Sequence, residues 1–401
     1  MSFMKIRVCV LFGGRSVEHE ISVISGLQAY NSLDRQKYEV TAVYISKSGT
    51  MYCGERISDI GAYKDIDGLL RDSYPVAMAR DGDGVKLLRL EPGLFKKPLI
   101  GYIDVVLPVV HGTNVEDGTA AGYLNMLGAA YAGCDILSSS VGMDKYATKL
   151  ILRESGIPVL DCRVYTVREY DANPMSVTAS VESELSYPVI VKPVNLGSSV
   201  GISVARDKEE LVSALEEAFR YSRRVLVERA ISSLTEINCS VLGDYDSCET
   251  SLLERPVSTE EILSYSDKYI AGSKGSKGMA STKRVIPADI SLETTRAIEE
   301  LAKKAFTALG CCGVARLDFM IDNSSGSIYL NEINTIPGSL SFYLWEPKGV
   351  SYSELLDRLI SLALKRRRDD SSITYTFDTN VLSNVSLQGA KGSKGAKLGG
   401  K

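Results

Sequence analysis

The sequence predicts an α/β protein made of three lobes. Short apolar runs alternate with helical patterns up to about residue 366, which is typical of layers of strands and helices. The chain has 401 residues, more than one hydrophobic core usually serves, so two or three lobes are expected. Hydrophobic residues make up 44% and charged residues 24%, as in ordinary globular proteins. We place the domains at 1–140, 141–230 and 231–368, with a tail at 369–401.

The first lobe begins with an apolar run that ends at two glycines, Gly13 and Gly14. A helical pattern follows, so a strand, a glycine turn and a helix are expected. The elements predicted for this lobe are strands at 5–12, 39–45 and 103–110 and helices at about 21–33 and 118–128.

The second lobe should begin with a helix at 143–155, because Gly156 and Pro158 are typical residues after a helix end. Strands are then expected at 187–193, 201–207 and 224–230, with a helix at 207–222. In the third lobe we expect helices at about 291–309 and 351–366 and strands at 314–322 and 327–333.

Two stretches do not fit this alternation. Residues 272–278 and 389–401 are rich in glycine and lysine and cannot pack a core. The tail is therefore expected to be flexible. For the internal copy a role in the active site stays open, because it lies between motifs that carry chemistry.

Net charge, apolar runs and cysteine content indicate which kinds of binding partner to expect. The net charge is only −4 and the basic residues are spread along the chain, so no nucleic-acid partner is expected. No apolar run reaches the length of a membrane span, and the N-terminus lacks the apolar core of a signal peptide. The eight cysteines are scattered without a CxxC pair, which favours reduced thiols in a cytoplasmic protein. A small-molecule site fits these features best.

Lys192 ends an apolar strand and precedes a loop of glycines and serines at 194–201. Small residues let backbone N–H groups approach phosphate oxygens, and the lysine adds a positive charge. The spacing is not that of a Walker loop, in which the lysine follows the glycines. By itself the pattern is equally consistent with a hairpin that happens to have a lysine beside it.

The third lobe carries candidates for a metal site. Asp318 lies in one expected strand, and Glu332 and Asn334 alternate onto one face of the next extended segment. Such oxygen ligands suit Mg²⁺ that also binds ATP phosphates. Arg316, on the same face as Asp318, and the backbone N–H of Gly338 could stabilise an oxyanion. The alternative, buried polar residues satisfied by hydrogen bonds alone, is less favoured because so many charged groups need stronger compensation.

Five motifs together resemble the D-alanine:D-alanine ligases of the ATP-grasp superfamily. They are HGTNVEDGT (111–119), VGMDK (141–145), VKPVNLGSSVG (191–201), RLDFM (316–320) and NEINTIPG (331–338). The resemblance extends over roughly residues 5–366. It implies an ATP-grasp fold of three α/β lobes, with the nucleotide between the central and C-terminal lobes.

The resemblance implies a reaction in two steps. ATP would phosphorylate the carboxylate of one D-alanine, and the amine of a second would attack the acyl phosphate, giving D-alanyl-D-alanine for peptidoglycan. Two Mg²⁺ ions, or Mn²⁺ in their place, would bind Asp318, Glu332 and Asn334. The implied ATP-binding residues are Lys145, Lys192, Ser199, Glu228, Ile231, Glu236 and Lys268. Glu228 would lie near the base and Glu236 near the ribose, although the spacing to Glu236 is one residue longer than in the family.

Substrate contacts are also implied. Glu18, in GGRSVEHEIS, matches the acid that binds the ammonium group of the first D-alanine. Tyr269 matches a loop tyrosine that bonds with this glutamate and with a serine, here Ser198, and so closes the site. His111 matches a histidine near the first substrate, but it could equally be a structural hydrogen-bond donor.

One departure concerns the second substrate. Tyr343 stands where dipeptide-forming members commonly have a serine that contacts the acceptor carboxylate. D-Serine or another amino acid is therefore an alternative acceptor. A nucleotide-binding regulator without activity should lack the metal ligands, and a biotin-type carboxylase should lack the segment around Glu18. The family also implies a homodimer.

Overall fold

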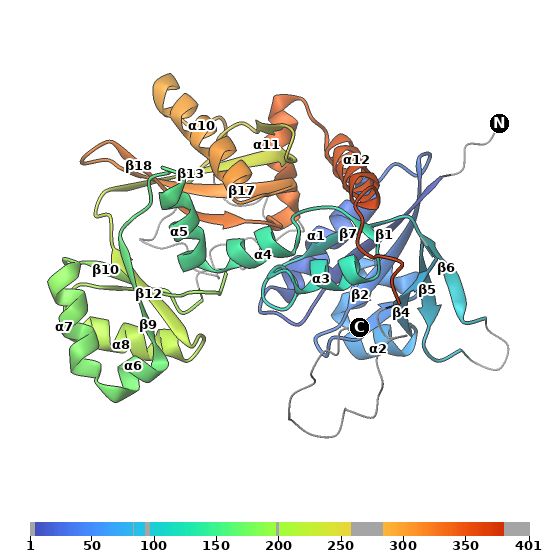
Figure 1. Ribbon diagram of the computed structural model, residues 1–401, viewed down its shortest axis with the longest axis horizontal. Helices are drawn as coiled ribbons and strands as arrows, with labels where there is room; N and C mark the ends of the chain where they lie inside the picture. The colour runs from blue at the N-terminus through green and yellow to red at the C-terminus, as the bar shows by residue number, and fades with distance from the viewer. Residues whose placement is uncertain (1–4, 83, 93–96, 198–199, 258–283, 381–401) are drawn as a thin grey trace, which may run out of the picture.

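The predicted α/β architecture is present in the computed structural model, which describes residues 5–82, 84–92, 97–197, 200–257 and 284–380. Figure 1 shows three groups of strands and helices. The N-terminal group, drawn in blue and cyan, and the green group lie at opposite ends of the view. The yellow and orange strands form the third group. A long C-terminal helix, α12 (Tyr352–Ser371), lies between this third group and the first.

The N-terminal sheet has the strand order β6-β5-β4-β3-β2-β1-β7-β8. Its strands are β1 (Ile6–Gly13), β2 (Tyr38–Ile45), β3 (Met51–Cys53), β4 (Tyr74–Asp81), β5 (Gly84–Arg89), β6 (Leu99–Ile103), β7 (Val105–Val110) and β8 (Ala130–Tyr131). Its helices are α1 (His19–Ser32), η1 (Glu55–Ser58), η2 (Ile60–Lys64), α2 (Ile66–Arg71) and α3 (Thr119–Met126). Strand β1 is parallel to β2 and β7 and buried along most of its length, as its apolar sequence predicts. Gly13 has φ +92°, and a Cβ there would lie 2.2 Å from the carbonyl oxygen of Ile45, so this turn requires glycine.

The second sheet has the order β11-β10-β12-β9. It comprises β9 (Cys162–Thr166), β10 (Val189–Pro193), β11 (Ser203–Ala205) and β12 (Arg224–Arg229), with α6 (Val167–Ala172), α7 (Pro174–Glu184) and α8 (Lys208–Phe219). Antiparallel pairing of β10 and β12 sets Lys192 opposite Leu226.

The third sheet has the order β14-β13-β17-β18. Its strands are β13 (Leu234–Gly243), β14 (Cys248–Thr250), β17 (Gly313–Asp322) and β18 (Ser327–Asn334), and β15 (Arg255–Pro256) pairs with β16 (Arg284–Val285) beside it. The helices of this part of the chain are α10 (Leu292–Ala308), which precedes β17, and η4 (Gly338–Ser341), α11 (Phe342–Trp345), η5 (Glu346–Lys348) and α12, which follow β18.

The helix expected at 143–155 is α5 (Lys145–Glu154), and a helix that was not predicted, α4 (Ile136–Met143), precedes it. Asp144 separates them because its backbone is extended, with φ −88° and ψ 100°. Its side chain accepts the N–H groups of Tyr146 and Ala147, which caps α5. Leu152 of α5 is buried in the cluster that contains α10 and the third sheet, so this helix packs on two lobes. The domain boundaries therefore stay a prediction.

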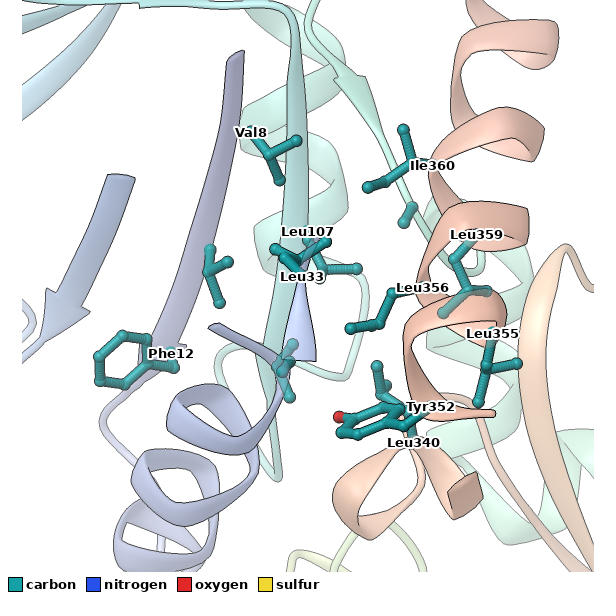
Figure 2. Packing of buried hydrophobic residues seen from close by; sticks show 14 of the residues in the cluster. Val8, Phe12, Leu33, Leu107, Leu340, Tyr352, Leu355, Leu356, Leu359 and Ile360 are labelled. Carbon is teal, nitrogen blue, oxygen red and sulfur yellow. The ribbon is translucent and has the colours of Figure 1, made fainter. Parts of the chain in front are cut away.

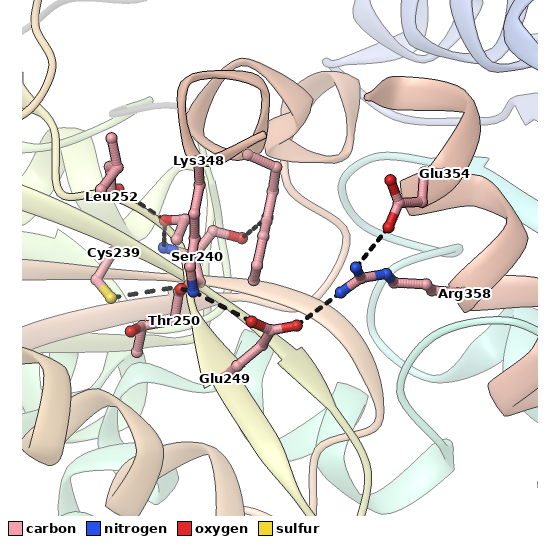
Figure 3. Close-up of polar contacts among 10 residues, drawn as sticks. Cys239, Ser240, Glu249, Thr250, Leu252, Lys348, Glu354 and Arg358 are labelled. Atoms are coloured by element: carbon pink, nitrogen blue, oxygen red, sulfur yellow. Dashed lines mark hydrogen bonds and ion pairs between the residues drawn. The ribbon is translucent and has the colours of Figure 1, made fainter. Parts of the chain in front are cut away.

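Helix α12, which follows the third sheet in the chain, packs against the first lobe. Its apolar face, with Leu355, Leu356 and Leu359, packs with Leu107 of β7 in one buried cluster (Figure 2). Polar contacts tie the same helix to the third sheet (Figure 3). Arg358 Nη1 donates to Glu249 Oε1 at 2.7 Å, and Glu249 Oε2 accepts from Lys348 Nζ at 3.1 Å. These half-exposed ion pairs orient α12 more than they stabilise it.

Truncation after Ser371 should leave both stability and activity unchanged. Residues 372–380 are exposed, including Ile373, Tyr375 and Phe377, so their removal uncovers no core. We expect the free energy of unfolding to change by less than about 0.5 kcal/mol, as for most surface changes. Chemical denaturation and a turnover assay on full-length and truncated protein check this. A large loss of activity would instead connect the tail to the active site.

Candidate active site

A buried ion cluster joins the second sheet to α5. Glu228 on β12 is fully buried; its Oε2 lies 2.8 Å from Lys149 Nζ, and its Oε1 accepts a hydrogen bond from Lys192 Nζ. Lys192 also donates to Asn331 Oδ1 at 3.0 Å. Burial alone would raise the pKa of Glu228, but Lys149 and Lys192 lower it to about 2. The cluster is therefore charged at neutral pH and holds Lys192 at the end of β10.

Lys149 was not predicted from the sequence. It lies four residues after Lys145, hence on the same face of α5, and this spacing was the available signal. Glu228 was expected near the nucleotide base. Here both of its carboxylate oxygens contact lysines, and contact with a base stays a prediction.

Lys145 connects the second and third lobes. It is the first residue of α5, its Nζ donates to the carbonyl oxygen of Leu196 at 2.7 Å, and this nitrogen lies 3.5 Å from Glu332 Oε2. The backbone N–H of Lys145 donates to the carbonyl oxygen of Val194. The lysine thus links the glycine-serine loop to the predicted metal ligands.

The predicted metal ligands lie together on β17 and β18. Asp318 is directly opposite Glu332 in the antiparallel register, and Asn334 is opposite Arg316. Arg316 donates Nε and Nη2 to the two oxygens of Asp318 at 2.7 and 2.8 Å, and Asn334 Nδ2 donates to Asp318 Oδ2 at 3.0 Å. Burial alone would lower the pKa of Arg316, but Asp318 raises it well above the usual value.

The donor set fits a hard cation. Two carboxylates and one amide oxygen on adjacent strands suit Mg²⁺ that also binds phosphate. Among the described residues, no three His, Cys, Asp or Glu side chains gather as a metal site. The predicted set contains only two carboxylates, so phosphate oxygens and water would have to complete the coordination.

A cavity brings these groups to one place. It is lined by Glu18, Glu116, Gly142, Met143, Lys145, Gly197, Glu332, Ile333, Asn334 and Thr335. Glu18, at the start of α1, thus faces the same space as Lys145 and two predicted metal ligands. Glu116 was not singled out from the sequence, although it lies inside the HGTNVEDGT motif. Burial first, and then the nearby charge of Glu18, raise the pKa of Glu116 to about 7.

His111 has both ring nitrogens engaged within the protein. Nδ1 lies 2.8 Å from the carbonyl oxygen of Ile336, and Nε2 lies 3.0 Å from Ser25 Oγ. Burial lowers the pKa of His111 to about 4, so the ring is neutral at pH 7. These contacts favour the structural alternative for His111, and a direct substrate contact stays a prediction.

Tyr343 lies in a polar cluster with Glu254 and Arg284. Its hydroxyl donates to Glu254 Oε2 at 3.3 Å, and the guanidinium of Arg284 lies over its ring, 4.1 Å from the centroid. Arg284 Nη1 is 3.3 Å from Glu254 Oε1. Burial and the charge of Glu254 raise the pKa of Tyr343 to about 12. Glu254 and Arg284 were missed because neither belongs to a recognised motif.

Other predicted residues are placed as follows. Gly338 begins η4, Ile231 lies two residues after the end of β12 and Glu236 lies on β13. Burial alone would lower the pKa of Lys192, but Glu228, and after it Glu332 and Glu236, raise it. Four predicted site residues lie outside the described residues: Ser198, Ser199, Lys268 and Tyr269. The glycine-lysine stretch at 272–278 also lies outside them. None of the helices in the described parts of the chain is long and apolar enough to cross a bilayer.

Comparisons with known proteins agree with this arrangement. Residues 7–134 match the family model of the D-ala D-ala ligase N-terminus, and residues 151–361 match that of the C-terminus. A D-alanine–D-alanine ligase from Caldicellulosiruptor bescii is 41% identical over 93% of this chain and 99% of its own length. The solved D-alanine-D-alanine ligase of Coxiella burnetii is 31% identical, with a TM-score of 0.76 over 92% of this chain and 96% of the solved one. The VanG D-Ala:D-Ser ligase of Enterococcus faecalis is also 31% identical, with a TM-score of 0.74 over 90% and 100% of the two chains. The matches extend over nearly the whole chain and include the strands and loops that build the cavity, so the chain belongs to the D-alanine–D-alanine ligase family and has the ATP-grasp fold.

Proposed function

We infer that this chain is an ATP-dependent ligase that joins two D-alanines into D-alanyl-D-alanine for peptidoglycan synthesis. One observation carries the inference beyond family membership. A single cavity is lined by Glu18 of the first lobe, Lys145 at the start of α5, and Glu332 and Asn334 of the third lobe. An ammonium-binding acid, a phosphate-binding lysine and metal ligands are the groups that this reaction needs in one place.

Some of the site residues would bind ATP, and Glu18 would bind the first D-alanine. Lys145 and Lys192 would bind phosphate oxygens of ATP as fixed positive charges. Glu18 would bind the ammonium group of the first D-alanine and thereby aim its carboxylate at the γ-phosphate. A carboxylate oxygen forms the new bond to phosphorus while the bond to ADP breaks. Ser199, Ile231, Glu236 and Lys268 would complete the nucleotide site, and Ser198 and Tyr269 would close it.

Asp318, Glu332 and Asn334 would hold two Mg²⁺ ions, with Mn²⁺ as a substitute. When bound, the ions would neutralise the phosphates and polarise the transferred phosphoryl group. Asn334 is oriented for this role because its Nδ2 donates to Asp318, which leaves its amide oxygen to act as a ligand.

In the second step the amine of the acceptor attacks the acyl carbon. The carbonyl oxygen becomes negative, phosphate leaves with the electron pair of the C–O bond, and the ammonium proton is released. Arg316 and the N–H of Gly338 would stabilise the oxygen that gains charge. Arg316 is already held rigidly by Asp318, so little reorganisation is needed.

The test is a turnover assay with purified protein, ATP, Mg²⁺ and a panel of D- and L-amino acids. Phosphate release and product mass are measured together. We expect D-alanine to give one phosphate per D-alanyl-D-alanine. Phosphate release without this product would contradict the proposed function. Mixed products with D-alanine and D-serine together would favour the alternative acceptor.

The family relatives favour D-alanine as the acceptor, and Tyr343 is the position at which the alternative acceptor is tested. The hydroxyl of Tyr343 donates a hydrogen bond to Glu254, so its proton is already used and is not available to an acceptor carboxylate. Tyr343→Ser should therefore change acceptor use, because it removes a ring and a fixed hydroxyl together. We expect kcat/KM for D-alanine as acceptor to fall by roughly tenfold, about the value of one lost hydrogen bond with packing. Tyr343→Phe is the matched control, since it keeps the ring and removes only the hydroxyl.

The measurement is acceptor kcat/KM for D-alanine, D-serine and glycine in both variants. If none of the three changes in either variant, Tyr343 does not line the acceptor pocket. A change in Tyr343→Ser alone assigns the effect to the ring.

We further propose that the protein works as a cytoplasmic homodimer. ATP as a substrate and eight free cysteines fit a reducing, ATP-containing compartment. Sedimentation of the purified protein with and without ATP tests the dimer.

A further inference from the structure

The turn after the metal-binding strand has a strained backbone. Ser339, Leu340 and Ser341 have φ of 51°, 53° and 53°, the left-handed region that residues other than glycine rarely adopt. Each such residue costs roughly 1–3 kcal/mol, so three in succession persist only if their surroundings hold them. The turn begins at Gly338, whose N–H is proposed to stabilise the reacting oxygen.

Helix α1 of the first lobe holds this turn by two hydrogen bonds. The backbone N–H of Ser339 donates to Ser25 Oγ at 3.0 Å, and the hydroxyl of Ser339 donates to Gln28 Oε1 at 2.6 Å. Ser25 and Gln28 are three residues apart and therefore neighbours on the helix surface. Both bonds cross from the first lobe to the third, over more than 300 residues of chain.

The hydroxyl of Ser25 both donates and accepts a hydrogen bond. The carbonyl oxygen of Ile336 can only accept, so Nδ1 of His111 carries the proton and Nε2 must accept. Ser25 therefore donates its hydroxyl proton to Nε2 of His111 and accepts from the N–H of Ser339. Ser25 is 1% exposed, so no water replaces either bond.

The residue two positions before Gly338 is fixed as well. Ile336 donates its N–H to Glu116 Oε1 at 3.0 Å and its carbonyl accepts from His111. The segment is thus held on both sides of Gly338, at Ile336 and at Ser339. Leu340 adds an apolar anchor, because it packs in the buried cluster with α12 (Figure 2).

Glu18 is the N-cap residue of the same helix, α1. A rigid helix therefore connects the acid proposed for the first substrate with the turn that presents Gly338. We propose that Ser25 and Gln28 are positioning residues for the ligase reaction, which hold the left-handed turn so that the N–H of Gly338 meets the oxygen that becomes negative. This proposal rests on the proposed function, because it needs the acyl-transfer step.

The test compares Ser25→Ala and Gln28→Met with Gln28→Glu, which keeps an acceptor oxygen. Gln28 is only half-buried, so its variants should fold even if Ser25→Ala does not. Thr178→Val is the control for a lost buried hydroxyl. Thr178 is 1% exposed, donates to the carbonyl oxygen of Met175 on α7 and is remote from the cavity.

Ser25→Ala should lower kcat by about 10²-fold, the typical effect of moving a catalytic group by about 1 Å. Gln28→Met should lower kcat by roughly tenfold, since it releases only one hydrogen bond. KM for ATP should stay unchanged in both, because Lys145 and Lys192 are not touched. Gln28→Glu and Thr178→Val should keep the kcat of the unmodified chain.

A double-mutant cycle with Gln28→Met and Ser339→Ala provides the second readout. The two changes should give less than additive losses in kcat, because either one breaks the same bond. Additive losses, or a kcat of Gln28→Met equal to that of Thr178→Val, would overturn the positioning role. Phosphate release and dipeptide mass are read in every assay. An unmodified chain that releases phosphate without forming dipeptide counts against the proposed function, and the ratio of variant rates still decides the role of the turn.

Discussion

Arg316→Ala should lower kcat by about 10² to 10³, the usual loss for one donor that stabilises an oxyanion. KM for ATP should rise far less, because the guanidinium is expected to act on charge that appears in the transition state. The structure adds a second reason for a large effect. Arg316 binds both oxygens of Asp318, so its removal also takes two hydrogen bonds and the neutralising charge from a predicted metal ligand.

Two further variants separate these causes. Arg316→Lys keeps the charge but loses the two parallel hydrogen bonds to Asp318. Arg7→Ala breaks another arginine–aspartate pair, with Asp104 in the first sheet, and should leave kcat unchanged. The measurements are kcat, KM for ATP and the Mg²⁺ concentration at half-maximal rate. Near-normal kcat in Arg316→Ala would remove this residue from the catalytic set. A defect that excess Mg²⁺ repairs would assign Arg316 to ligand positioning alone.

Glu228→Gln should reduce the free energy of unfolding by about 3 to 5 kcal/mol, the cost of leaving buried charges unpaired. Both Lys149 and Lys192 lose their carboxylate partner, and Glu228 itself has no exposed surface. KM for ATP should also rise, because Lys192 is no longer held in place. Denaturant titration and ATP titration measure the two effects.

The lowered pKa of Glu228 predicts the direction in which stability changes with pH. The folded pKa of Glu228, about 2, lies below the usual value of 4.5. Its ionised form therefore stabilises the fold fully above about pH 4.5, and this contribution is lost as the pH falls toward 2. The stability difference between the two proteins should shrink between pH 5 and pH 3. Glu217→Gln, which breaks an exposed pair with Arg220, is the control and should cost far less stability, because exposed ion pairs contribute little. Equal losses of unfolding free energy in Glu228→Gln and Glu217→Gln would show that the buried cluster contributes no more to stability than an exposed ion pair.

Much of the fold could be predicted where local pattern and burial agree. Strand β1 is apolar from Val8 onward because it is a central parallel strand, and α10 and α12 have regular helical spacing. Strands β9 and β13 and most of the edge of the first sheet were not predicted. Short strands there, such as β3 (Met51–Cys53), are defined by their neighbours more than by their own sequence. Helix α4 was not predicted, and the start of α5 was placed two residues early because the capping role of Asp144 depends on local geometry.

By itself the sequence determined the family and the chemical groups at the site, because motifs such as RLDFM and NEINTIPG place ligands at fixed steps along two strands. Only the tertiary structure decided which distant groups complete the site. Lys149 meets Glu228, and Ser25 and Gln28 hold the turn at Ser339, through contacts between residues far apart in the chain. No local periodicity encodes such contacts. They exist because packing of three lobes buries polar groups that must then find partners across the interface.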